Sequence, residues 1–252
     1  LCKPMIRLID DINATRISLR DSHYSQVILS HIKTYGSSYS FCEFYELVRG
    51  GKRIGLFSSF NGSVAGDTLE GATPDRSCIR ETAEFISFKN PYSAELAPLL
   101  SGRAGINGYI RVKRSFYEIP AGKIPPGLNS SPNLEAVYKT AFGDSGEEYG
   151  IWLTDTVRRR NMGLLRVFSL GGSCLTVRFC GCGWAYICDV ATPVEERGHG
   201  QARALMMGVS SIYSEMGYSC YLAADESTKD YYDHIGFKTL GGDYVYKFRS
   251  GF

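Results

Sequence analysis

The spacing of apolar residues in the first half of the chain alternates between helical and strand patterns. Apolar positions three or four residues apart indicate helices, and short apolar or β-branched runs bounded by glycine turns indicate strands. The pair Asn61-Gly62 between two such runs is a strong hairpin signal. The predicted elements are a helix from 6 to about 35, strands at 41–48, 53–60 and 63–69, a helix from Pro74, a helix at 94–100 and a strand at 108–119. We therefore expect an α+β domain.

The second half begins after a proline-rich connector at 120–132. The predicted elements are helices at 133–142 and 147–161, strands at 164–170, 173–180 and 184–190, a helix at 202–216, a strand at 218–224, a helix at 227–234 and a strand at 243–248. Together they predict a mixed helix-and-strand domain. The run Arg158-Arg159-Arg160 is expected to be a solvated helix end. A length of 252 residues favours two domains, which we place at 1–125 and 126–252.

Composition narrows the classes of protein that need to be considered. Hydrophobic residues make up 44% and charged residues 21% of the chain, which is a globular composition. A net charge of +2 gives no reason to expect nucleic acid or an acidic membrane as a partner. Apolar runs are too short for a transmembrane helix, and Leu1-Cys2-Lys3-Pro4 lacks the apolar core of a signal peptide. The expected location is the cytoplasm.

Half of the eight cysteines lie close together, which raises the question of a metal site. They are Cys174, Cys180, Cys182 and Cys188. Their spacing is neither Cys-x-x-Cys nor paired with two histidines, so we favour free thiols packed as small apolar residues over a zinc site. Gly181-Cys182-Gly183 is predicted to be the turn of a hairpin. No metal cofactor is expected.

The clearest chemical signal is a glycine turn between a predicted strand and a predicted helix, at 189–202. The first turn of a helix has unpaired N–H groups and a partial positive charge, and both favour phosphate oxygens. Gly198 and Gly200 carry no side chain that would keep a diphosphate away from these donors. The P-loop and dinucleotide-binding motifs are absent from the sequence. The turn is therefore a candidate pyrophosphate site.

Two separated motifs of the second half resemble the GCN5-related N-acetyltransferase (GNAT) superfamily. Arg197-x-x-Gly200-x-Ala202 resembles its coenzyme-binding signature, and Tyr232-Asp233-His234-Ile235-Gly236-Phe237 resembles its later Tyr-x-x-x-Gly-Phe signature. The order of predicted elements over 133–248 is also that of the family, and the resemblance implies a central, twisted, mostly antiparallel sheet flanked by helices. The first half is either a degenerate copy of the same unit or an unrelated α+β domain, and both alternatives remain open.

The resemblance implies binding of acetyl-CoA and transfer of its acetyl group to an amine by direct attack. It places the pantetheine arm in a gap between the strand at 184–190 and the strand at 218–224, and it makes Tyr232 the acid that protonates the departing thiolate. A phenol with an ordinary pKa of about 10 suits that role. The expected coenzyme contacts are Val190, Ala191, Thr192, Arg197, Gly198, His199, Gly200, Gln201, Ala202, Asp225 and Ser227.

Departures from the family pattern leave alternatives open. Asp225 stands where many members have an asparagine, and Pro193 is shifted by one place. The usual strand glutamate is absent, so Asp189, Asp225 or Glu226 acting through water are candidate bases. A non-catalytic module that binds or senses acyl-CoA and contacts a protein partner is the alternative function. The acceptor, a small-molecule or peptide amine, is not readable from the sequence, and a homodimer is one assembly to test.

Overall fold

The computed structural model describes residues 3–102, 105–143 and 146–249. The chain divides into two compact units, one formed by 1–114 with 243–252 and the other by 115–242. We call them unit 1 and unit 2. The chain crosses between them within β6 (Tyr109–Ile119) and again within β11 (Lys238–Phe248). The predicted boundary at 125/126 separates domains that would fold independently. The division into compact units does not test independent folding, so this boundary remains a prediction.

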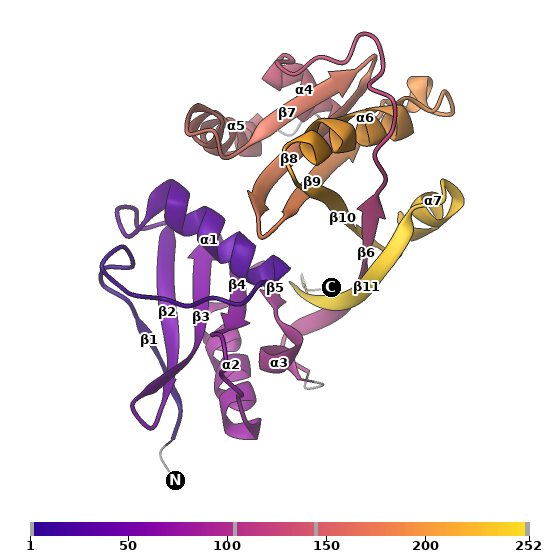
Figure 1. Ribbon diagram of the computed structural model, residues 1–252. Coiled ribbons are helices and arrows are strands. Elements are labelled where there is room, and N and C mark those ends of the chain that lie inside the picture. Colours follow the sequence, from indigo (N-terminus) through magenta and orange to yellow (C-terminus); the bar gives the residue numbers. More distant parts are fainter. Residues whose placement is uncertain (1–2, 103–104, 144–145, 250–252) are drawn as a thin grey trace. The chain divides into compact units, whose positions relative to one another are not determined.

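Unit 1 contains a strand meander with a helix on each face (Figure 1). Its elements are β1 (Met5–Leu8), α1 (His23–Tyr35), β2 (Cys42–Arg49), β3 (Lys52–Phe60), β4 (Ser63–Thr68), α2 (Arg76–Lys89), β5 (Ser93–Leu96), α3 (Pro98–Ser101) and parts of β6 and β11. The strand order is β1-β2-β3-β4-β5-β11. Ile28 of α1 packs against Leu56 and Phe44, whereas Ile86 of α2 packs against Leu47 on the other face.

Two predictions for unit 1 are wrong. The helix expected within 6–35 starts only at His23, after Ser22 caps its N-terminus, and Met5–Leu8 instead forms β1, antiparallel to β2. The helix expected at 94–100 is β5, followed by the single helical turn of α3, which begins at Pro98. In both places a short edge or buried strand has no long periodic pattern of its own, so spacing alone assigned it to a neighbouring helix.

Unit 2 has the same kind of arrangement. Its elements are the end of β6, α4 (Leu134–Phe142), α5 (Gly146–Asn161), β7 (Arg166–Leu170), β8 (Ser173–Gly181), β9 (Trp184–Ala191), a 3-10 turn η1 (Val194–Glu196), α6 (Gln201–Glu215), β10 (Ser219–Asp225), α7 (Lys229–His234) and the start of β11. The strand order is β6-β10-β9-β8-β7. Leu205 and Val209 of α6 pack on Ile187 and Leu222, and Val137 of α4 packs on Val167 at the other face. The predicted elements of this half are present, and Figure 1 shows their order along the chain.

The two units repeat one pattern of connections. In each, a meander of three antiparallel strands ends in a strand that a helix joins to a parallel neighbour, β4 to β5 in unit 1 and β9 to β10 in unit 2. The helices are α2 and α6. Such a repeat favours a degenerate copy over an unrelated domain for the first half.

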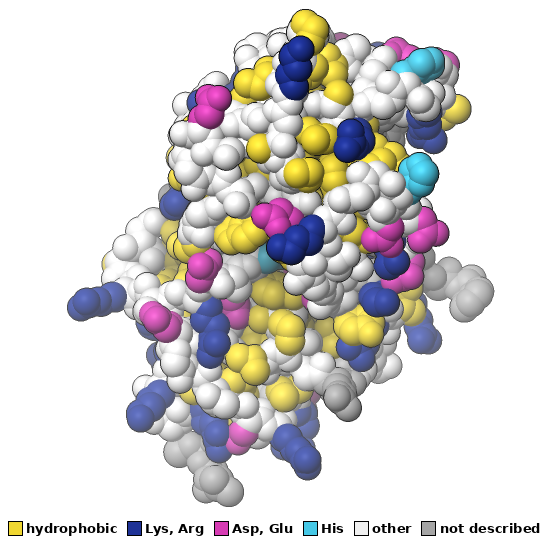
Figure 2. All heavy atoms as spheres, turned by 45° about the vertical axis from the view of Figure 1, so that its right-hand side comes forward, with side chains coloured by type: hydrophobic (Ala, Val, Ile, Leu, Met, Phe, Trp, Pro, Cys, Tyr) yellow, Lys and Arg dark blue, Asp and Glu magenta, His cyan; other side chains and the backbone are white. Residues whose placement is uncertain are grey.

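Charged and apolar side chains are intermixed on the face of the molecule shown in Figure 2. Lysines and arginines lie among aspartates and glutamates there, in keeping with a net charge of +2. In the described residues, no helix combines the length and the apolar character needed to cross a membrane. The free cysteines include Cys174 and Cys220, both buried in hydrophobic clusters of unit 2. Among the described residues, no group of three or more potential ligands could hold a metal ion.

Candidate functional site

The strands β9 and β10 pair over only part of their length. Their parallel register runs from Trp184 opposite Ser219 to Ile187 opposite Leu222. Both strands are fully described, and beyond these residues no pairing joins Cys188–Ala191 to Ala223–Asp225. Backbone N–H and C=O groups along this stretch of β9 are therefore available on the side of β10, where an extended ligand could pair with them as an added strand.

A β-bulge lies at the point where this pairing ends. On the side of β8, Cys188 is opposite Thr176 and Ala191 is opposite Cys174, so two residues of β9, Asp189 and Val190, face one residue of β8. Asp189 has a φ of +53°, a left-handed conformation that residues with a side chain seldom adopt. The bulge turns the end of β9, and it is a feature that the apolar pattern did not reveal.

The turn after β9 leads into the N-terminus of α6 without a side-chain cap. Gly200 is the N-cap residue, with a φ of +71°, and it has no side chain that could accept a hydrogen bond from the first turn. A Cβ added to Gly198 or Gly200 would meet open space, because no heavy atom lies within 4 Å. The end of the helix is thus exposed to solvent, and its N–H groups can bind an anion.

Side chains of the turn are held by their own loop. The Nε of Arg197 donates to the carbonyl oxygen of Thr192 at 3.0 Å, and Nδ1 of His199 lies 3.1 Å from the carbonyl oxygen of Glu196. Gln201 accepts a hydrogen bond from the N–H of Gly172 at 3.2 Å, which directs its amide toward the turn between β7 and β8. These contacts favour backbone donors as the anion ligands, since the side chains are already engaged.

The remaining predicted contacts are distributed along the same corner of unit 2. Val190 and Ala202 pack against the hydrophobic cluster beneath α6, whereas Ala191 packs on the cluster beneath α4. Thr192 Oγ1 is hydrogen-bonded to Ser173 Oγ at 2.8 Å. After β10, Asp225 Oδ1 accepts hydrogen bonds from Ser227 N–H at 3.1 Å and from its hydroxyl at 2.6 Å, so the Ser227 hydroxyl is used within its own turn.

Tyr232 lies on α7 and is 8% exposed. The centroid of its ring lies 5.4 Å from the ring centroid of Tyr117 and 6.2 Å from that of Phe237. Burial, followed by the nearby Tyr231 and the charge of Asp225, raises the pKa of Tyr232 well above its usual value, so the phenol keeps its proton at neutral pH. A hydrogen bond of 2.7 Å from the Tyr117 hydroxyl to Asp233 fixes α7 against β6.

The matching corner of unit 1 is closed by a side chain of the protein. Asp75 caps α2, and its Oδ1 accepts hydrogen bonds from the N–H groups of Ser77 at 3.0 Å and Cys78 at 3.1 Å. Arg49 is paired with Asp75 at 2.7 Å. A pocket of about 510 Å³ lies beside this helix end. Because a carboxylate already occupies the donors, α2 lacks the exposed end that α6 has.

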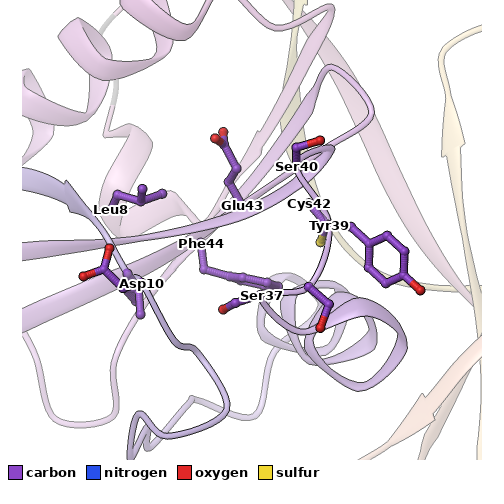
Figure 3. A pocket seen from close by; sticks show the side chains of 10 residues that line it. Leu8, Asp10, Ser37, Tyr39, Ser40, Cys42, Glu43 and Phe44 are labelled. Carbon is purple, nitrogen blue, oxygen red and sulfur yellow. The ribbon is translucent and has the colours of Figure 1, made fainter.

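A second pocket in unit 1, of about 270 Å³, lies where β1, the segment after α1 and β2 meet (Figure 3). Asp10, Ser37 and Glu43 are among the residues that line it. The Glu43 carboxylate is already engaged by Lys89 Nζ at 2.9 Å and by the Tyr45 hydroxyl at 2.7 Å. None of the predicted coenzyme contacts lines this pocket.

Sequence reasoning missed a buried charge cluster on the face of unit 2 covered by α5. Arg159, expected at a solvated helix end, is 0% exposed, and its Nε lies 2.7 Å from Asp155 Oδ1. The other carboxylate oxygen of Asp155 is 3.1 Å from Arg178 Nη2. The spacing of four residues between Asp155 and Arg159 was the available signal, since it places both side chains on one face of a helix.

Comparison with known proteins supports the fold but not an individual relationship. No protein-family model matches the sequence, and no curated protein matches it significantly. A GNAT acetyltransferase of Colwellia psychrerythraea is similar over 97% of this chain and 99% of its own, with 13% identity and a TM-score of 0.53. A GCN5-related N-acetyltransferase of Kribbella flavida is similar over 90% of this chain and 95% of its own, with 14% identity and a TM-score of 0.55.

A tandem GNAT protein of the clavulanic acid biosynthesis pathway covers both units. The similarity extends over 96% of this chain and 97% of that protein, with 10% identity and a TM-score of 0.55. Identities this low show the fold alone. The expected mixed α+β fold and its resemblance to the superfamily are thereby confirmed. The chain has the fold of the GCN5-related N-acetyltransferases, in a two-unit form similar to that of a tandem GNAT protein.

Proposed function

We propose that unit 2 binds acetyl-CoA and transfers its acetyl group to an amine by direct attack, without a covalent enzyme intermediate. One observation carries the proposal. The separation of β9 from β10 lies directly before an uncapped helix end whose two glycines face open space. An acyl-CoA needs both features, an anion site for its diphosphate and an edge of backbone for its pantetheine arm. Open space at Gly198 and Gly200 supports the proposal, because a diphosphate needs a corner free of side chains.

Binding is assigned to the backbone of the turn and of β9. N–H groups around Gly198, Gly200 and Gln201 would hold the diphosphate, and Val190 to Thr192 would pair with the amide groups of the arm. When bound, the coenzyme supplies an activated thioester. Arg197 keeps the turn in shape through the carbonyl oxygen of Thr192, and His199 acts as a loop residue.

Tyr232 is assigned to protonation of the leaving sulfur. Its raised pKa keeps the phenol protonated at neutral pH, and its ring belongs to the hydrophobic cluster that also contains Leu222 and Ala224 of β10. Backbone N–H groups of β9 would stabilise negative charge on the carbonyl oxygen. The acceptor is a small-molecule or peptide amine, and the reaction suits a cytoplasmic enzyme.

The contrast between the two helix ends implies one coenzyme for each chain. Asp75 already satisfies the first N–H groups of α2 and would repel a phosphate, whereas α6 has no such cap. Isothermal titration with acetyl-CoA is expected to give a stoichiometry near one. A value near two would show that unit 1 also binds, and it would reject the role given to Asp75.

The function itself is tested with purified protein, acetyl-CoA and a panel of amines. Amino acids, polyamines, aminoglycosides and peptides with free N-termini are each added, and release of the free thiol of CoA is followed by a thiol reagent. We expect release with at least one amine. Binding alone raises thermal stability, by about 2.7 kcal/mol at a hundredfold excess over Kd. Tight binding without release for every amine would favour the non-catalytic module, and no binding would reject both.

A further inference from the structure

An unusual carboxylate lies at the bulge of β9. Asp189 is the first of the two residues that face a single residue of β8, one position after Cys188. The pairing of β9 with β10 has ended two residues earlier, at Ile187. The carboxylate is therefore attached to the backbone where the two strands separate, which is where the proposed thioester would lie.

Two properties of Asp189 are costly for stability. Its Oδ2 atom is buried and has no hydrogen-bond partner among the described residues. Buried polar atoms in folded proteins are nearly always hydrogen-bonded, so an exception calls for an explanation such as a water molecule or a ligand. Its backbone also has a φ of +53°, and strained residues of this kind gather at functional sites. The burial and the backbone conformation are independent observations, and both concern the same residue.

The face on which the carboxylate lies follows from its neighbours. Ala185 and Ile187 of β9 point into the cluster beneath α6. Asp189 instead adjoins Cys174, which belongs to the cluster beneath α4 and whose Sγ lies 3.9 Å from the Asp189 carbonyl oxygen; burial, followed by the charge of Asp189, raises the pKa of the Cys174 thiol. The carboxylate is thus on the side away from α6. Because α4 covers this side, an acceptor would approach the carboxylate through the gap between β9 and β10.

Competing bases along this stretch are less suitable. Burial, followed by the charge of Asp189, raises the pKa of the Cys188 thiol well above its usual value, so the thiol stays protonated. The Asp225 carboxylate already accepts two hydrogen bonds from Ser227. Glu226 is exposed beyond the end of β10.

We infer that Asp189 is the catalytic base that takes the proton from the acceptor amine, through a water molecule bound at its buried Oδ2 atom, and this inference rests on the proposed acetyl transfer. The amine nitrogen forms a bond to the acetyl carbonyl carbon, and the carbon–sulfur bond breaks. The proton lost by nitrogen goes to Asp189, and the sulfur receives a proton from Tyr232. The substrates and products balance, with CoA and the amide as products and no further reactant.

Variants at this position can remove the carboxylate without disturbing the backbone. Asn and Gly both tolerate a positive φ, so Asp189→Asn and Asp189→Gly are expected to fold. Glycine also leaves space for a small carboxylate from solution. The matched control is Asp230→Asn, an exposed aspartate in the first turn of α7.

The decisive experiment measures CoA release with the best amine of the panel, for the wild-type chain and the variants, with and without sodium formate. We expect kcat to fall by about 100-fold or more in both Asp189 variants, with the affinity for acetyl-CoA retained. Formate should restore turnover in Asp189→Gly and not in Asp189→Asn, and Asp230→Asn should behave as wild type. A residue that only supports the fold would not respond to formate.

Two outcomes overturn the inference, and they differ from failure of the function. Near wild-type turnover in either Asp189 variant would exclude the base, and so would an Asp189→Gly variant that binds acetyl-CoA, turns over slowly and ignores formate. In both cases acetyl transfer by the wild-type chain still stands. If the wild-type chain releases no CoA with any amine, the proposed function fails and the role of Asp189 is rejected with it.

Discussion

Arg159 and Asp155 form a buried ion pair on successive turns of α5, with Nε of the arginine 2.7 Å from Oδ1 of the aspartate. Arg159 has no exposed surface, and Asp155 is also buried. A second arginine, Arg178 of β8, reaches the other oxygen of the same carboxylate at 3.1 Å. The cluster therefore joins α5 to the sheet by charge, in addition to the apolar packing of Trp152.

Loss of Arg159 should be strongly destabilising. Arg159→Ala removes one of the two arginines that pair with the buried Asp155 and leaves a cavity, for which a loss of about 2–5 kcal/mol in the free energy of unfolding is expected. Urea denaturation followed by circular dichroism measures it. The neighbouring Arg160 is exposed, and Arg160→Ala should change stability by less than about 0.5 kcal/mol. Equal effects of the two substitutions would contradict the buried role.

Replacement of Tyr232 should separate chemistry from binding. Tyr232→Phe keeps the packing against Tyr117 and Phe237 and removes only the hydroxyl, so the affinity for acetyl-CoA should stay within about twofold while kcat falls by about 100-fold or more. Steady-state kinetics and titration calorimetry give the two quantities. The control is the adjacent Tyr231, which is 41% exposed. If Tyr232→Phe turned over like Tyr231→Phe, Tyr232 would be a core residue only.

The charge of Asp75 should stabilise unit 1 in a way that depends on pH. Hydrogen bonds from Ser77 and Cys78, with the charge of Arg49, lower the pKa of Asp75 from 3.8 to about 2. A depressed pKa in the folded state gives stability that is present above the unfolded value and is lost as the pH falls through the folded value. Asp75→Asn should therefore melt at a lower temperature than wild type at pH 7.

The difference in melting temperature between Asp75→Asn and wild type should shrink from about pH 4 downward and vanish only below about pH 2. Thermal unfolding at a series of pH values measures it. A constant difference over this range would show that the carboxylate charge plays no part. Acetyl-CoA binding by unit 2 should be unchanged in the variant, because Asp75 belongs to unit 1.

The sequence was most informative where local chemistry decides the structure. Gly198 and Gly200 adopt positive φ values at a turn that glycine favours, and the apolar face of the following helix from Leu205 to Tyr213 is buried as its spacing predicts. The hairpin turn at Cys182-Gly183 is likewise present, both residues having positive φ. These features depend on residues close together in the chain, so a single sequence contains the signal.

Features that depend on distant partners could not be predicted. Met5–Leu8 is a strand because Tyr45–Val48 lies beside it, and no local pattern in four residues reveals that. Arg159 is buried because Asp155 and Arg178 compensate its charge. The bulge at Asp189 exists only in relation to the register of β8. Where tertiary contacts override local preference, the structure is needed.

The exposed helix end at Gly200 is the centre of the account, and one pair of variants tests it most directly. Gly200→Glu and Gly217→Glu place the same charged side chain at a positive φ at the two ends of α6, where an added Cβ meets open space in both cases. Backbone strain is therefore matched, and only Gly200 adjoins the proposed diphosphate site. In titration calorimetry with acetyl-CoA, Gly217→Glu should bind like wild type and Gly200→Glu should not bind. Retained binding by Gly200→Glu would contradict the account.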